Sequence, residues 1–133
     1  MGFEQYHEPP EELSDEVRTF ARMCANLTEE AEAIGWYRQR ISLEPDPVSR
    51  AIMEDSLGEE YKHFCMELEY LFRHTPEWRE TARGILFQEG DIVENGGAAE
   101  AAVDAGEPVS STAPPAPDTS TDLGIGSLRG EGI

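Results

Sequence analysis

The chain has 133 residues, of which 28 are acidic and 10 are basic, and its formal net charge is −18. This charge excludes nucleic acid and anionic membrane surfaces as natural partners and favours cations or a basic protein. The sequence shows two cysteines without a C-x-x-C motif, no secretion signal and no apolar run long enough to span a bilayer, so we expect a cytoplasmic protein.

The first predicted helix runs from about residue 11 to residue 42. Pro10, followed by acidic residues, suits a first helical turn, and the prolines of "EPDP" at 44–47 disfavour helical geometry in the residues before them. Between these signals the apolar residues recur three or four positions apart, with one longer step. This spacing is typical of one stripe along a helix, made of Leu13, Val17, Phe20, Cys24, Leu27, Ala31, Ile34 and Ile41.

Two further helices are predicted before residue 91. The second runs from about residue 47 to residue 74, where "TP" ends it, and its inward residues are Val48, Ile52, Leu57, Phe64, Leu68 and Leu71. The third is the segment "PEWRETARGILFQ" at 76–88, which Gly90 closes. No strand pattern occurs, so we expect an all-α domain over residues 1–91, an antiparallel two-helix hairpin plus a shorter third helix. A domain of this size buries little apolar surface, so we expect a partner chain to complete its core.

The composition changes after this domain. Residues 92–121 are mainly Ala, Gly, Pro, Ser, Thr and acids, which predicts a disordered linker because little apolar surface offsets the entropy of ordering. Residues 122–133 begin with "DLGIGSLRG", which gathers apolar residues and the one basic residue after position 90. A short cluster of apolar residues at the end of a disordered linker predicts a docking peptide, whose contact residues are Leu123, Ile125, Leu128 and Arg129.

Two glutamates fall on the apolar stripes of the first two helices. Glu30 follows Leu27 by three positions, and Glu60 follows Leu57 by three, so each should face inward. An unpaired carboxylate removed from water costs several kcal/mol unless it is neutralised or binds a metal. His63 lies three positions after Glu60 and therefore on the same helical face. The pattern indicates a metal site.

Di-iron carboxylate bundles combine a Glu from each of two helices with Glu-x-x-His from each of the other two. This chain has one copy of each element, Glu30 and the segment "EYKH" at 60–63, so one subunit holds half a site. Two subunits about a twofold axis would supply four helices, four glutamates and two histidines. The competing interpretation is a solvated Glu and His beside a core stripe, since E-x-x-H also arises by chance in Glu-rich helices.

The helical motifs and the terminal peptide together resemble the encapsulated ferritins, short ferritin-like cargo proteins held inside encapsulin nanocompartments. The motifs are "EEAEAIGWYRQR" (29–40), "EEYKH" (59–63), "ILFQEG" (85–90) and "LGIGSLR" (123–129). The resemblance covers most of residues 12–92 plus the peptide. It implies a ferritin-like four-helix bundle completed by dimerisation, a homodecamer of five such dimers, and a di-iron ferroxidase centre shared between two subunits.

The resemblance also implies roles for individual residues. Glu30, Glu60 and His63 correspond to the iron ligands, with Trp36 and Tyr37 as an aromatic pair beside the catalytic centre. Other matched positions are the carboxylates Glu29 and Glu32 on the path by which iron enters, and the peptide residues Leu123, Ile125, Leu128 and Arg129, which correspond to the signal that binds the encapsulin wall. The chain departs from the family at an outer metal site, where Asp55 replaces a histidine and Lys62 replaces an acid.

Two functional hypotheses follow. Carboxylates and imidazole suit Fe(II), and their negative charge favours Fe(III) still more, which eases oxidation by dioxygen. We therefore expect a ferroxidase with two irons per subunit pair, without organic cofactor, that delivers iron for storage inside a cytoplasmic encapsulin compartment. The alternative is a non-enzymatic acidic helical protein that binds a partner or buffers cations. Metal stoichiometry and oxygen consumption separate the two.

Overall fold

The computed structural model describes residues 5–112, so residues 1–4 and 113–133, the predicted docking peptide included, lie outside this account. A short 3-10 helix, η1 (Pro10–Glu12), precedes four α-helices. These are α1 (Asp15–Leu43), α2 (Pro47–His74), α3 (Pro76–Arg83) and α4 (Ile92–Ala105). No strand occurs between residues 5 and 112, which confirms the all-α class. None of these helices is both long and apolar enough to cross a membrane.

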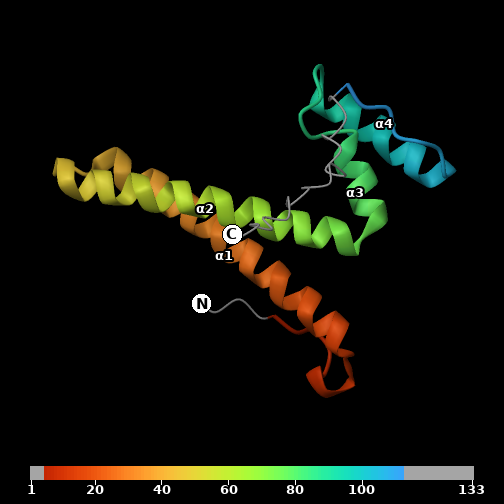
Figure 1. Ribbon diagram of the computed structural model, residues 1–133, viewed down its shortest axis with the longest axis horizontal. Coiled ribbons are helices and arrows are strands. Elements are labelled where there is room, and N and C mark those ends of the chain that lie inside the picture. Colours follow the sequence, from red (N-terminus) through yellow and green to blue (C-terminus); the bar gives the residue numbers. More distant parts are fainter. Residues whose placement is uncertain (1–4, 113–133) are drawn as a thin grey trace, which may run out of the picture.

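The first two helices form the predicted hairpin, and they make the most extensive contact between elements in the described chain. The α1 helix begins at Asp15 rather than near residue 11, because the Ser14 hydroxyl accepts the Val17 N–H at 3.2 Å and caps it there. The α2 helix has the predicted bounds, with the Asp46 carboxylate accepting the Ser49 N–H at 2.7 Å. In Figure 1 the two helices lie together at the hairpin end and separate toward the start of α1.

The core of the single chain is small. The buried apolar residues within the described range are Ala25, Leu57, Leu71, Phe72, Ala82 and Ala99. The prediction that Val48 and Ile52 face inward is wrong for the single chain, because their exposed fractions are 67% and 63%. A two-helix hairpin covers one face of each helix, so apolar residues at its tip have no neighbour to cover them.

The α3 helix packs on the end of α2, where the Trp78 and Phe72 rings meet edge to face with their centroids 5.3 Å apart. It ends at Arg83, so the predicted helix through residue 88 is wrong at its C-terminal end. The chain turns there, with the Leu86 N–H donating to the Ala82 carbonyl at 2.8 Å. Phe87 then adopts a left-handed φ of 60°, which a helix cannot contain.

The α4 helix corrects the prediction that residues 92–121 are disordered, because Ile92–Ala105 form a regular helix. The Asp91 carboxylate accepts the backbone N–H groups of Val93 and Glu94 at its start, and Gly106 ends it with a left-handed φ of 68°. Low apolar content suggested disorder, but alanine has the highest helix propensity and allows helices to approach closely. Ala99, 2% exposed, makes that approach to α3. Figure 1 shows α3 and α4 as a pair beyond the end of α2.

Candidate metal centre

The hairpin brings together the three predicted metal ligands. The α1 helix contributes Glu30, and α2 contributes Glu60 and His63, which share one helical face because they are three residues apart. One ligand atom from each side chain lies within 4.8 Å of the other two. His63 Nδ1 is 3.9 Å from Glu30 Oε1 and 3.8 Å from Glu60 Oε2. Segments far apart in the sequence thus meet at one point.

The donor set fits an iron ion. The distances from His63 Nδ1 to the Glu30 and Glu60 oxygens are longer than a hydrogen bond, so an ion can lie between the imidazole and the carboxylates. Two carboxylates and one imidazole make a mixed oxygen and nitrogen set, which suits divalent first-row metals. The imidazole points its Nδ1 toward Glu30 and Glu60, whereas Nε2 lies 3.9 Å from Glu59 Oε2. His63 Nδ1 is therefore the nitrogen placed to bind a metal.

The electrostatics of the centre also favour a cation. The pKa of Glu30 is raised from 4.5 to about 7, chiefly by its hydrogen bond with Glu60 and then by burial and by the negative charges of Glu60 and Glu67, while His63 acts in the opposite direction. Two carboxylates this close share a proton more readily than both ionise. A metal cation between them removes that repulsion, so the site is arranged to exchange a proton for a metal.

Sequence reasoning missed one further acid, Glu67. It lies four residues after His63 and seven after Glu60, so the helical period places all three on one face of α2. Burial, and next the charges of Glu29 and Glu60, raise the pKa of Glu67, while His63 lowers it. The spacing of three and then four residues from Glu60 through His63 to Glu67 could have identified this acid from the sequence, because it continues the same helical face.

The other predicted site residues lie on α1 around Glu30. Glu29 and Glu32 are exposed. Tyr37 is half-buried and Trp36 is 52% exposed. The guanidinium carbon of Arg40 lies 5.7 Å from the Tyr37 ring centroid and 6.0 Å from that of Trp36. The structure thus brings both rings to Arg40.

At the outer metal site of the family, where the sequence of this chain departs from the pattern, Lys62 brings a cationic side chain. The Lys62 ammonium forms an ion pair with Glu59, one turn earlier on α2. This hydrogen bond and the charge of Lys62 lower the pKa of Glu59. Asp55, the other departure from the family pattern, is exposed on the same helix. Lys62 therefore supplies a positive charge beside Glu59 without a metal.

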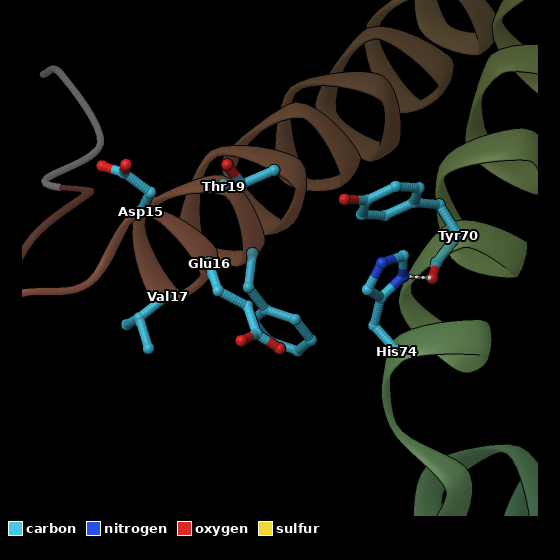
Figure 2. Close-up of a pocket in the computed structure, with 7 residues that line it drawn as sticks. Asp15, Glu16, Val17, Thr19, Tyr70 and His74 are labelled. Carbon is cyan, nitrogen blue, oxygen red and sulfur yellow. Dashed lines mark hydrogen bonds between the residues drawn. The ribbon is translucent and has the colours of Figure 1, made fainter.

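A groove of about 340 Å³ lies elsewhere on the hairpin, where α1 and α2 separate (Figure 2). Its lining consists of Asp15, Glu16, Val17, Thr19, Phe20, Tyr70 and His74. The His74 and Tyr70 rings are stacked with their centroids 4.1 Å apart, and His74 Nδ1 is 2.8 Å from the Tyr70 carbonyl oxygen. The groove begins roughly three helical turns from Glu30 along α1, so it is separate from the metal centre.

A helical hairpin that gathers two carboxylates and an imidazole has the features of a ferritin-like carboxylate protein. Comparison with known families agrees with this class. The model of the EncFtn-like family matches residues 5–89, and the chain belongs to this family. The resemblance to encapsulated ferritins is thereby confirmed, and an iron-related function follows from membership in a ferritin-like family.

Individual relatives support the assignment. An "Encapsulated ferritin-like protein" of Rhodospirillum rubrum is 41% identical over 127 residues, which cover 94% of this chain and 88% of the relative. A "Ferritin-like protein" of Thermotoga maritima is 43% identical over 91 residues, covering 68% of this chain and 80% of the relative. The crystal structure of protein ne0167 from Nitrosomonas europaea superposes with a TM-score of 0.64 at 37% identity, covering 65% of this chain and 96% of that one.

Proposed function

We propose that the protein is a ferroxidase, which oxidises Fe(II) to Fe(III) at a centre shared by two subunits. The observation that carries the proposal is the convergence of Glu30, Glu60 and His63 within 4.8 Å. Bundles that hold two irons use four glutamates and two histidines, which is twice the set in this chain. A second copy related by a twofold axis completes the set, because a symmetric interface brings identical groups together.

The exposed apolar residues of the hairpin support pairing with a second chain. They lie on both long helices and at the turn between them, and comprise Val17, Trp36, Leu43, Val48, Ile52, Tyr61 and Met66. Apolar surface of this extent in a small chain is typical of an interface. Two hairpins packed on these faces form a ferritin-like four-helix bundle, and five such dimers form the homodecamer that the family resemblance implies.

The reaction follows from the ligand chemistry. Negative carboxylates stabilise Fe(III) more than Fe(II) and so make loss of an electron easier. Two irons held in one dimer supply two electrons, which dioxygen accepts. Glu30 gives up its proton when iron binds, since a carboxylate must be ionised to act as a ligand. As the family resemblance implies, Tyr37 and Trp36 form an aromatic pair beside the shared centre, and Glu29 and Glu32 line the path by which iron enters.

The oxidised iron passes to an encapsulin compartment in the cytoplasm. The Rhodospirillum rubrum relative is named an encapsulated ferritin-like protein, and its alignment covers 94% of this chain. The terminal peptide, through Leu123, Ile125, Leu128 and Arg129, binds the inner wall of that shell. The alternative, a cation buffer or acidic partner-binding protein, draws its support from the net charge of −18 alone.

Three ligand variants test the proposal. Glu30→Ala, Glu60→Ala and His63→Ala should each slow Fe(II) oxidation by about 100-fold or more, because each removes a metal donor. Stopped-flow absorbance and oxygen consumption measure the rate. Circular dichroism should show unchanged helix content, since removing Glu30 or Glu60 relieves repulsion in the metal-free centre and the His63 side chain is 44% exposed. Glu69→Ala, whose side chain pairs with Arg73 at 2.9 Å on another face of α2, is the matched control. Wild-type kinetics in all three ligand variants would place the chemistry elsewhere and favour the cation buffer.

A further inference from the structure

Glu67 has a buried oxygen that no side chain or backbone group of the described residues pairs with. Its Oε2 atom is shielded from solvent, and within residues 5–112 it has no hydrogen-bond partner. A buried acceptor left unpaired costs about 1–3 kcal/mol, more when it is charged. The carboxylate therefore needs a partner that residues 5–112 of one chain do not supply. That partner must be a proton, a cation or a group from another chain.

The surroundings of Glu67 favour a positively charged partner. Glu29 on α1 and Glu60 on α2 bring negative charge to it, and the group acting in the opposite direction is His63. Glu67 is not among the three side chains whose donor atoms converge within 4.8 Å, so it lies beside the centre and outside it. A cation at a half-buried acid that is close to two other acids gains from several negative charges at once.

The acids on this side of the hairpin lie at two depths. Glu29 is exposed at the hairpin surface, whereas Glu67, Glu30 and Glu60 are each partly buried. Oxygen donors at successive depths let an ion lose its water in steps, because each carboxylate replaces part of the hydration shell. Glu67 lies on the α2 face that leads to His63 and Glu60.

We propose that Glu67 binds Fe(II) as an auxiliary carboxylate, together with Glu29 across the hairpin, and holds the ion beside the centre before it reaches Glu30, Glu60 and His63. This inference rests on the proposed ferroxidase function, because it places a substrate ion on the way to that site. It assigns a role to an acid that the family resemblance and the ligand pattern did not include.

The test is an anaerobic titration of the full-length assembled protein with Co²⁺ alone, followed by calorimetry. We expect the wild type to bind more Co²⁺ than the two ions per subunit pair of the centre. Glu67→Gln should lose the additional ions and keep those two, because Gln preserves the size of the side chain and removes its charge. Glu69→Gln is the matched control: it makes the same change two residues along α2 and should bind as many ions as the wild type.

Oxidation kinetics give a second readout. In Glu67→Gln the Fe(II) concentration for half-maximal rate should rise about tenfold while the maximal rate stays the same, because the variant loses a holding site and keeps the centre. Thermal unfolding of the metal-free variant checks that it folds, and native mass spectrometry reports its assembly.

Several outcomes would overturn the inference. They are a wild type that binds two Co²⁺ per subunit pair and no more, equal ion counts in Glu67→Gln and Glu69→Gln, or a Glu67→Gln protein that changes only its assembled mass. The last result would show that Glu67 bonds to another chain. Failure of the ferroxidase proposal looks different, since Glu60→Ala would then bind as many Co²⁺ ions as the wild type.

Discussion

At the scale of single residues, the centre concentrates groups that oppose folding when no metal is present. Glu30 and Glu60 approach closely enough to share a hydrogen bond, and Glu67 adds a third negative charge nearby. Such an arrangement costs stability in the metal-free protein and is retained where function needs it. The charges that we propose to bind the metal are therefore also the charges that make the metal-free chain sensitive to pH.

The stability of the metal-free protein should fall as pH rises. The folded-state pKa of Glu30, about 7, lies above its ordinary value of 4.5, so the stability linked to its protonation is fully present below pH 4.5 and is lost as pH rises through 7. Urea unfolding with a chelator present, at fixed protein concentration, should give a lower midpoint at pH 8 than at pH 5.5.

A Glu30→Gln variant is the control for this pH effect. Gln keeps the shape of the protonated acid and does not ionise, so the fall in stability between pH 5.5 and pH 8 should be smaller than in the wild type. If both proteins lose the same stability over this interval, the pH dependence arises from other groups.

At the scale of elements, the contact between α3 and α4 depends on one glycine. A Cβ atom at Gly84 would lie 2.6 Å from Val109 Cγ1 and 2.7 Å from Ala99 Cβ, closer than side chains pack. The absence of a side chain lets the end of α3 approach α4. This contact stabilises a helix whose residues alone have too little apolar surface to fold.

Gly84→Ala should therefore lower the free energy of unfolding by about 1–3 kcal/mol, because the added methyl group forces α3 and α4 apart. Gly97→Ala provides the opposite case in the middle of α4, since a Cβ there meets nothing within 4 Å. It should raise stability by about 0.5–1 kcal/mol through helix propensity. Urea unfolding followed by circular dichroism compares the two, and a Gly84→Ala protein as stable as the wild type would contradict the close packing.

At the scale of the whole molecule, a single hairpin leaves apolar surface uncovered and, under the proposed function, holds half of a ligand set. Val48 and Ile52 are exposed, and the chain supplies one imidazole and two converging carboxylates. In the proposed dimer, a second copy would cover the apolar surface and complete the ligand set at the same interface. Metal binding and assembly should consequently be linked, because an ion that binds only the associated state adds its free energy to association.

Removal of iron should shift the mass distribution toward smaller species. At a metal concentration of 100 times the dissociation constant, the stabilisation amounts to about 2.7 kcal/mol, roughly a hundredfold in the association constant. Native mass spectrometry at micromolar protein, before and after chelation, measures the shift. Glu60→Ala should show no dependence on metal. An oligomeric state that ignores metal in the wild type would argue against a shared site.

Deleting residues 122–133 should abolish co-purification with a co-expressed encapsulin shell and leave ferroxidase activity intact. Many weak peptide contacts per assembly would sum to firm retention, so the loss should be nearly complete. Replacing Leu123, Ile125 and Leu128 by Asp keeps the length of the chain and tests whether the apolar side chains carry the contact. Packaging of the truncated protein at the wild-type level would contradict the docking role.

The amino-acid sequence by itself determined the features that depend on local chemistry. Proline signals and apolar spacing predicted the α-helical class and the bounds of α2, Pro47–His74, because helix geometry is set within a few residues. The same periodicity placed Glu60 and His63 on one face. The start of α1, which the Ser14 cap fixes at Asp15, lies a few residues after the predicted start.

The tertiary structure alone decided how distant segments meet. Glu30 reaches Glu60 and His63 because α1 and α2 pack as a hairpin, and the helical period says nothing of distances between two helices. Helix α4 likewise depends on Ala99 docking beside Gly84, a close approach that composition does not reveal. The buried Oε2 of Glu67 belongs to the same class, since burial is a property of the packed hairpin and a carboxylate is polar in any sequence.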